Sequence, residues 1–267
     1  MIRRILVSLF SFFGIEVRRK SSPSLTELIL KSLPYPDHQE ISGLTVSEKH
    51  TLNNFRVPRY HYLNECRWRI LLQSGLSFHG KTIFEPGAGI GDQTQWLLSQ
   101  GVKEIIVSDG RPENVGIIRK RFLDESRVTV VQRDLEAFLT QSSNVFQTDI
   151  VFLWGVYYHI HDPYPEFKIL RQLSKISPII VFDYLESLTE LSWVQEYNYD
   201  DPSASISKKS LRLSRSDLVQ GLLQIYNHVY FPKTQLDIID PSNIATPRRI
   251  VIASQSPLNY FGLEETK

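Results

Sequence analysis

The stretch that most constrains this chain is a glycine-rich segment, Lys81–Asp109, which reads KTIFEPGAGIGDQTQWLLSQGVKEIIVSD. It begins with a short apolar run typical of a strand and continues into a loop with alternating glycines, Gly87, Gly89 and Gly91. After the loop the apolar residues fall on one face of a helix, and a second apolar strand ends at Asp109. This order of elements predicts one βαβ unit of a nucleotide-binding sheet.

The alternating glycines give the loop a specific capacity for ligand binding. Because glycine lacks a Cβ atom, the backbone can adopt positive φ and a ligand can lie directly against it. The N–H groups at the start of the following helix favour an anionic group. Asp109 lies roughly 20 residues beyond the loop, where an acid accepts hydrogen bonds from ribose hydroxyls. The segment therefore predicts a ligand that contains a nucleoside.

Two details indicate which kind of nucleoside. The loop reads G-x-G-x-G, whereas a dinucleotide site usually reads G-x-G-x-x-G, so an oxidoreductase that uses NAD is disfavoured. Glu85 precedes the glycines, and its carboxylate would repel a pyrophosphate but suit a cationic sulfonium or aminoacyl group. The run Glu85–Gly91 (EPGAGIG) resembles the first motif of the class I S-adenosylmethionine-dependent methyltransferases, an acid followed by G-x-G-x-G. Pro86 departs from that motif, in which a small aliphatic residue is more usual.

The resemblance implies a doubly wound α/β fold with a mostly parallel, seven-stranded Rossmann-like sheet and an N-terminal helical extension. Six apolar runs follow the first strand and fit this fold: residues 104–107, 127–132, 149–154, 178–182, 229–231 and 249–253. In the resembled family the last of these strands is antiparallel. We expect three regions: an N-terminal extension at 1–60, a methyltransferase domain at 61–256 with a loop or cap insertion near 184–213, and a C-terminal tail at 257–267. Within the extension, residues 21–58 read as an irregular lead-in with one short helix at 25–33.

S-adenosyl-L-methionine is the cofactor that the resemblance implies. The glycine loop is expected to hold its methionine part, Asp109 its ribose, and Asp134 its adenine amino group. A helix cap is the alternative role for Asp134, and the two roles are compatible. The residues expected to bind the cofactor are Glu85, Gly87, Ala88, Gly89, Gly91, Asp109, Gly110, Asp134, Leu135 and Trp154.

A second motif follows the fourth predicted strand. The run 155–163 (GVYYHIHDP) is similar to the G-V-L-Y-H segment of many small-molecule methyltransferases and of some that modify the tRNA wobble position. An alcohol or amine acceptor must lose a proton, and His159 is the leading base because histidine titrates near neutral pH. His161 is the second candidate, and Tyr158 joins them as an aromatic residue of the catalytic pocket; a structural role is the alternative for each. Two histidines without clear further ligands do not favour a metal site, so none is expected.

Composition excludes some function classes. A formal net charge of +1 gives no bulk electrostatic case for a nucleic-acid partner. The single cysteine, Cys66, cannot form an internal disulfide and fits a reducing cytosol. Residues 1–20 combine basic flanks with an apolar run too short to span a bilayer. A cytoplasmic location is expected, and peripheral membrane contact through an interfacial helix at 1–20 is weighed against a helix packed on the domain.

The resemblance as a whole implies an S-adenosylmethionine-dependent methyltransferase that acts on a small molecule or a sugar-containing metabolite. One alternative is a transferase that modifies the wobble uridine of tRNA. Another is a non-catalytic scaffold that keeps the cofactor fold. The patterns carry no signal for an oligomeric state.

Overall fold

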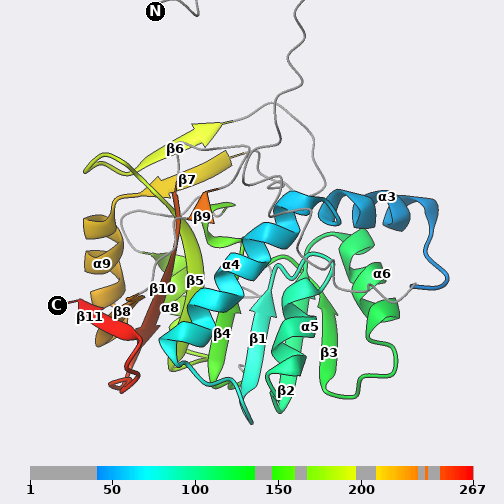
Figure 1. The fold of residues 1–267 in the computed structure, drawn as a ribbon, viewed down its shortest axis with the longest axis horizontal. Coiled ribbons are helices and arrows are strands. Elements are labelled where there is room, and N and C mark those ends of the chain that lie inside the picture. The colour runs from blue at the N-terminus through cyan, green and yellow to red at the C-terminus, as the bar shows by residue number, and fades with distance from the viewer. Residues whose placement is uncertain are drawn as a thin grey trace, which may run out of the picture. The chain divides into compact units, whose positions relative to one another are not determined.

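The apolar runs of the sequence form the centre of a sheet in the computed structural model of the chain (Figure 1). The structure describes residues 41–135, 146–159, 167–196, 209–233, 238–239 and 247–266. They belong to one unit, Tyr35–Lys267. The expected helix at 25–33, the segment 1–20 and the candidate base His161 lie outside the described residues. In the described part of the chain, no helix has the length and apolar character that crossing a membrane requires.

Five strands of the sheet run parallel: β1 (Thr82–Pro86), β2 (Glu104–Asp109), β3 (Val128–Gln132), β4 (Ile150–Leu153) and β5 (Ile179–Glu186). β10 (Pro247–Ser254) lies antiparallel between β5 and β8 (His228–Pro232). The strand order is β11-β8-β10-β5-β4-β1-β2-β3. The expected doubly wound, mostly parallel sheet is confirmed, including the antiparallel direction of the strand predicted at 249–253.

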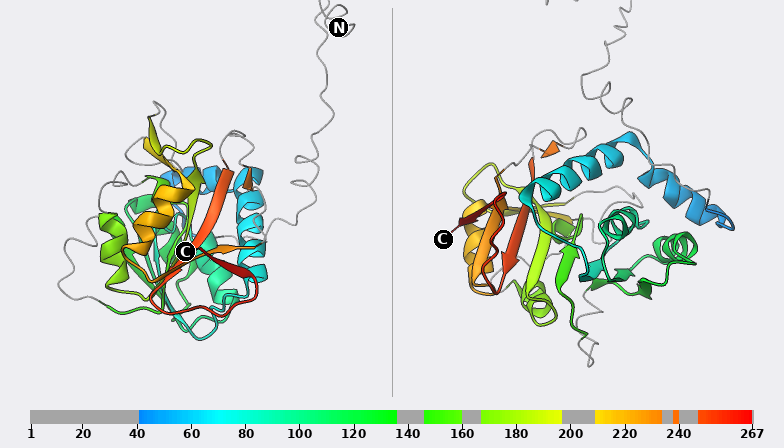
Figure 2. Two further views of the ribbon diagram at one scale, coloured as in Figure 1. Left: turned by 90° about the vertical axis from the view of Figure 1, so that its left-hand side faces the viewer. Right: turned by 60° about the horizontal axis from the view of Figure 1, so that its bottom comes forward.

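Helices cover both faces of this sheet (Figure 2). On one face lie α4 (Pro58–Ser74), α5 (Asp92–Ser99) and α6 (Pro112–Arg121), and on the other lie α8 (Lys168–Ser174) and α9 (Arg215–Leu223). Consecutive side chains of a strand point into opposite cores. In β1, Ile83 packs in the core with α4 and α5, whereas Phe84 packs in the core with α8 and α9.

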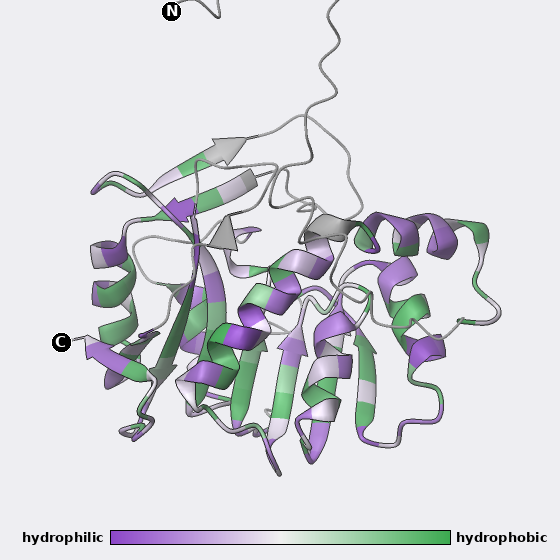
Figure 3. Cartoon of the chain, viewed as in Figure 1, coloured by the Kyte–Doolittle hydropathy of each residue, from purple (hydrophilic) through white to green (hydrophobic). Residues whose placement is uncertain are grey.

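The structure contains a helix that the sequence pattern did not indicate. α3 (Val46–Phe55) lies within the stretch expected to be an irregular lead-in, and that expectation was wrong. Thr45 and Glu48 form a reciprocal capping box at its start. The helix is largely hydrophilic (Figure 3) and buries only Glu48, Thr51 and Leu52, so it lacks the wide apolar stripe by which an amphipathic helix is recognised.

The described residues hold eleven strands, whereas the resemblance implied seven. Inside the expected insertion near 184–213, β6 (Trp193–Glu196) pairs with β7 (Lys209–Leu213), which continues the sheet by pairing with β5. β9 (Ile238–Ile239) pairs with β10, and β11 (Leu263–Thr266) pairs with β8 inside the segment expected to be a tail. These additions are short edge strands, and they leave the arrangement of the central strands unchanged.

Candidate active site

A cavity lies beyond the carboxyl ends of β1, β2 and β4, the edge at which an open α/β sheet binds its ligands. Its volume is about 230 Å³, several times the roughly 30 Å³ that one water molecule occupies in the liquid. Ten of the residues predicted from the sequence line it: Gly87, Ala88, Gly89, Asp109, Gly110, Asp134, Leu135, Trp154, Tyr158 and His159. Two predicted residues, Glu85 and Gly91, are not part of its lining.

The glycine loop turns sharply at the mouth of β1. Gly87, Gly89 and Gly91 all have positive φ, at 69°, 59° and 82°. A Cβ atom on Gly87 would collide with the side chain of Val156, so this position requires glycine on steric grounds as well. The backbone N–H groups of Gly87 and Ala88 donate to the Ser108 carbonyl at 2.7 and 3.2 Å. The loop is thereby fixed to the end of β2.

Asp109 links the end of β2 to the glycine loop. Its Oδ2 accepts a hydrogen bond from the Gly89 N–H at 2.9 Å. Its Oδ1 accepts from the Arg111 N–H at 2.8 Å and from Asn114 Nδ2 at 3.1 Å. Burial raises the pKa of Asp109, although these donors oppose the rise. A carboxylate held by three donors at the rim of the cavity is oriented to accept further hydrogen bonds from a ligand.

Glu85 lies beneath the loop and not in the cavity. The residue is 1% exposed, and its Oε2 accepts from the Thr94 hydroxyl at 2.7 Å. Its Oε1 is buried and has no hydrogen-bond partner among the described residues. Burial raises the pKa of Glu85 to about 8, so this group is mainly a neutral acid at pH 7. The negative charge that the sequence predicted beside a sulfonium is therefore not supplied by Glu85 at that pH.

Gly110 and Asp134 form the opposite wall of the cavity. A Cβ atom on Gly110 would lie 3.0 Å from the Asp134 Cβ, so a larger residue at position 110 would require Asp134 to move slightly. Leu135 follows on the same wall and is 8% exposed. This wall therefore combines an acidic side chain, Asp134, with an apolar one, Leu135.

The segment after β4 supplies aromatic residues and a histidine. Trp154 is buried, and its ring stacks on Phe152 with the centroids 4.8 Å apart. Tyr158 and His159 belong to the short 3₁₀ helix η1 (Tyr157–His159), and the centroids of their rings lie 4.3 Å apart. Burial raises the pKa of Tyr158, although the nearby Arg248 opposes the rise, so its hydroxyl stays protonated and cannot act as a base near neutral pH. Of the described residues, His159 remains the candidate for a base, since it also lines the cavity.

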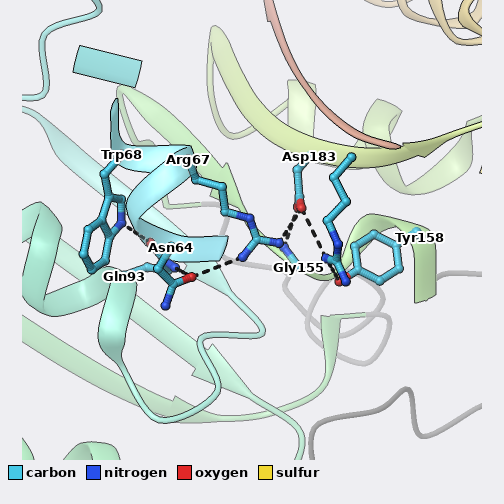
Figure 4. A network of polar contacts seen from close by, with 8 residues as sticks. Asn64, Arg67, Trp68, Gln93, Gly155, Tyr158 and Asp183 are labelled. Carbon is cyan, nitrogen blue, oxygen red and sulfur yellow. Dashed lines mark hydrogen bonds and ion pairs between the residues drawn. The ribbon is translucent and has the colours of Figure 1, made fainter. Parts of the chain in front are cut away.

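A chain of polar contacts joins α4 to the start of α5 (Figure 4). Gln93 accepts from Trp68 Nε1 at 2.6 Å through its Oε1 and donates to Asn64 Oδ1 at 2.6 Å through its Nε2. The same Asn64 oxygen accepts from Arg67 Nη1 at 3.2 Å. Asn64, Arg67 and Gln93 also line the cavity, so α4 forms its third wall.

The chain of contacts continues from Arg67 to a fully buried carboxylate, Asp183 of β5 (Figure 4). Its Oδ2 accepts from Arg67 Nη2 at 2.6 Å and lies 3.6 Å from Arg248 Nη1, while its Oδ1 accepts from the Gly155 N–H at 2.6 Å. Arg248 in turn donates to the hydroxyl of Tyr158. We call Arg67, Tyr158, Asp183 and Arg248 the arginine cluster.

Comparison with known proteins identifies the fold. No family model and no curated protein matches the chain. Among solved structures, the N-terminal domain of EvdMO1, crystallised in the presence of SAH and D-fucose, is 19% identical with a TM-score of 0.53, over 72% of this chain and 82% of that one. The fold is that of the S-adenosylmethionine-dependent methyltransferases. The resemblance predicted from the glycine loop is confirmed at the level of the fold.

Two further solved structures have the same methyltransferase fold. The 1,6-didemethyltoxoflavin-N1-methyltransferase of Burkholderia thailandensis, with its substrate and S-adenosylhomocysteine bound, is 14% identical with a TM-score of 0.54, over 79% of this chain and 88% of that one. A Listeria monocytogenes protein described as a putative S-adenosylmethionine-dependent methyltransferase is 14% identical with a TM-score of 0.51, over 72% of this chain and 100% of that one.

Several residues of the cavity were not singled out from the sequence. They come from the end of α3, from α4, from the first turns of α5 and α6, and from β10: Phe55, Tyr60, Asn64, Arg67, Gln93, Asn114 and Arg248. The available signal was the polar face of α4, where Asn64 and Arg67 lie one turn apart. Asp183 carried a weaker signal, since it is an acid within an otherwise apolar strand.

Proposed function

We propose that this protein is an S-adenosylmethionine-dependent methyltransferase whose acceptor is a small molecule or a sugar-containing metabolite. The observation that carries the proposal is the Asp109 carboxylate bound to the Gly89 N–H at the rim of the cavity. This contact places a ribose-binding acid against a loop that allows close approach of a ligand. The fold supports it, and structures of that fold crystallised with D-fucose or 1,6-didemethyltoxoflavin favour a small acceptor.

The residues of the cavity fit the proposed cofactor. Asp109 would hold the ribose, Asp134 and Leu135 the adenine, and the Gly87–Gly89 backbone the methionine part. The cofactor, when bound, supplies a methyl group already activated by its sulfonium. The protein then needs mainly to orient the acceptor and to exclude water. Trp154 is 5% exposed on the cavity wall, but the Arg67 guanidinium already lies over its ring, 5.4 Å from the centroid, and Phe152 stacks on it. A cation–π role toward the sulfonium therefore has little support.

His159 is proposed as the group that removes the acceptor proton. It lines the cavity beside Tyr158, directly after the loop in which a methyl acceptor is expected. Histidine as a residue type titrates near neutral pH, whereas burial raises the pKa of Tyr158 and keeps its hydroxyl protonated. A base in this place contributes only if the acceptor is an alcohol or amine that loses a proton during transfer.

Ligand binding tests the cofactor assignment. In titration calorimetry we expect S-adenosylhomocysteine to bind the protein and NAD not to bind. The substitution Asp109→Asn should weaken S-adenosylhomocysteine by about tenfold or more, because a charged acceptor of hydrogen bonds is lost. Asp124→Asn, at an exposed position after α6, serves as the matched control and should leave the affinity unchanged. Preferential binding of NAD, or equal affinity in Asp109→Asn, would contradict the proposal.

Measurement of turnover tests whether His159 acts as the base. With a panel of hexoses, deoxyhexoses and sugar nucleotides as acceptors, release of S-adenosylhomocysteine measures activity. His159→Ala should lower kcat by about a hundredfold or more while the affinity for S-adenosylhomocysteine changes little. His50→Ala, an exposed histidine on α3, is the control and should keep full activity. Wild-type turnover in His159→Ala would remove His159 from the reaction.

A further inference from the structure

Asp183 is a fully buried carboxylate whose presence neither the proposed cofactor nor the proposed base explains. It lies on β5 where β4 ends, because the last paired residues of the two strands are Leu153 and Phe182. Side chains alternate along a strand, so Asp183 points toward α4, as Val181 does. A buried charge is costly unless it is paired and hydrogen-bonded, so the partners of Asp183 indicate what it does.

The two carboxylate oxygens of Asp183 bind two different parts of the chain (Figure 4). Oδ2 accepts from Arg67 Nη2 of α4 at 2.6 Å, and Oδ1 accepts from the Gly155 N–H, just after β4, at 2.6 Å. Burial alone would raise the pKa of Asp183, but the guanidinium groups of Arg67 and Arg248 and the Gly155 N–H hold it below its usual value. The Gly155 N–H therefore donates to an anion, and such a bond is stronger than one between neutral groups.

Gly155 begins the segment that carries the proposed base. Its φ of 71° lies in the left-handed region that glycine adopts readily, and the chain turns there from β4 toward η1. The turn of η1 is closed by a bond within the segment, from the His159 N–H to the Val156 carbonyl at 2.8 Å. That bond sets the shape of the turn, whereas the bond from Gly155 to Asp183 ties the turn to β5. Asp183 therefore fixes where the segment lies on the sheet.

The same segment adjoins the glycine loop. A Cβ atom on Gly87 would lie 2.3 Å from Val156 Cγ2, so Val156 packs directly against the loop. Tyr158 and His159 follow on the wall of the cavity. A shift of the segment would move His159 relative to a bound acceptor, and a misplacement of about 1 Å can lower a rate by roughly a hundredfold.

Stability alone is a poor reason for the buried pair of Arg67 and Asp183. Apolar residues of similar volume often replace a buried ion pair without loss of stability. An apolar residue at position 183, however, could not accept the Gly155 N–H. We propose that Asp183 is a positioning residue for methyl transfer, which holds the Gly155–His159 segment, and with it the imidazole of His159, at the cavity. This inference rests on the proposed function, because it takes His159 to be the base.

Amide exchange measured by NMR shows directly whether Asp183 holds the segment, and this measurement needs no acceptor. Gly155 is the only glycine that follows a tryptophan, so isotope labelling of the tryptophan carbonyl and the glycine nitrogen gives a single cross-peak for its amide. The same labelling of tyrosine and histidine gives two cross-peaks, for the pairs at 60–61 and 158–159, and the one missing from His159→Ala belongs to His159. In Asp183→Asn a neutral amide offers one oxygen to two donors, so both amides should exchange with solvent about tenfold faster or more.

Turnover shows whether the position of the segment matters for the reaction. With hexoses, deoxyhexoses and sugar nucleotides as acceptors, Asp183→Asn should lower kcat by about tenfold or more, while the affinity for S-adenosylhomocysteine changes little. Asp149→Asn is the matched control, because Asp149 accepts from the Thr82 N–H at 2.8 Å at the opposite end of β4. It should leave kcat and both amides as in wild type.

A second variant serves if Asp183→Asn does not fold. Arg67→Met combined with Asp183→Leu removes both charges, and an apolar pair in their place is expected to fold. Its kcat should be about tenfold or more below that of Arg67→Met alone, which keeps the acceptor for the Gly155 N–H.

Three results would overturn the inference. The first is unchanged exchange of the Gly155 and His159 amides in Asp183→Asn. The second is wild-type kcat in that variant. The third is an equal loss of kcat in Asp149→Asn, which would assign the effect to a general loss of stability. Failure of S-adenosylhomocysteine to bind wild type would instead defeat the proposed function, while the two amides would still report the contact with Asp183, so the two failures are distinct.

Discussion

Glu85 shows how burial changes what one side chain can do. In the sequence it is an acid before a glycine loop, and a carboxylate there suits a cationic ligand. In the structure one of its oxygens accepts from Thr94 and the residue is withdrawn from the cavity. Desolvation favours the protonated form of a buried carboxyl group. Glu85 is therefore better placed to support the loop from below than to meet a sulfonium directly.

The protonation of Glu85 predicts how stability depends on pH. Burial raises its pKa in the folded state from 4.5 to about 8, so the folded state retains a proton that the unfolded state releases. The stabilisation from this group is fully present below about pH 4.5 and is lost as the pH rises through about 8. Glu85→Gln, which stays neutral, should flatten that dependence in denaturant unfolding of the protein without ligand.

Glu190→Gln, at an exposed position in the turn before β6, is the control for that measurement. It should reproduce the slope of the wild type across the same pH range. An identical slope in Glu85→Gln and wild type would show that Glu85 ionises in the folded protein as it does in the unfolded chain.

At the scale of elements, the sequence predicted those strands and loops that a local pattern of residues encodes. Five parallel strands, the glycine loop and the acid at the end of β2 could be read directly, because apolar runs and alternating glycines are local signals. α3 could not be read from hydropathy, since it is an exposed, polar helix. The start of α3 could have been predicted, because Thr45 and Glu48 have the spacing of a capping box.

No local pattern in the sequence predicts the arginine cluster. Arg67 and Asp183 are 116 residues apart in the sequence, and Tyr158 and Arg248 are 90 apart. Neither pair has a spacing that periodicity could reveal, because both are brought together only when α4 and β10 take their places around the sheet. The residues predicted to bind the cofactor are thus encoded by contiguous motifs, whereas the arginine cluster depends on the assembled fold.

At the scale of the whole molecule, the segment after β10 belongs to the sheet. β11 pairs with β8 over four residues, from Leu263 with Pro232 to Thr266 with Val229. Leu263 is 7% exposed and packs in the core that α4 and α5 share. Gly262 lies so close to the end of α4 that a Cβ atom there would collide with the Gln73 carbonyl. The segment therefore closes one edge of the sheet and also contacts the helix that carries Arg67.

Removal of residues 257–267 should accordingly lower the free energy of unfolding. Exposing Leu263 alone costs about 2 kcal/mol, which corresponds to a fall in Tm of roughly 4–8 °C for a domain of this size. The loss of β11 hydrogen bonds and of the bond from the Leu258 N–H to the Tyr230 hydroxyl adds to it. Differential scanning calorimetry measures the effect, and full-length Glu264→Ala, which changes an exposed side chain of the same strand, is the control. A truncated protein with the Tm of the full-length chain would mean that the sheet is complete at β8 and that β11 adds nothing to its stability.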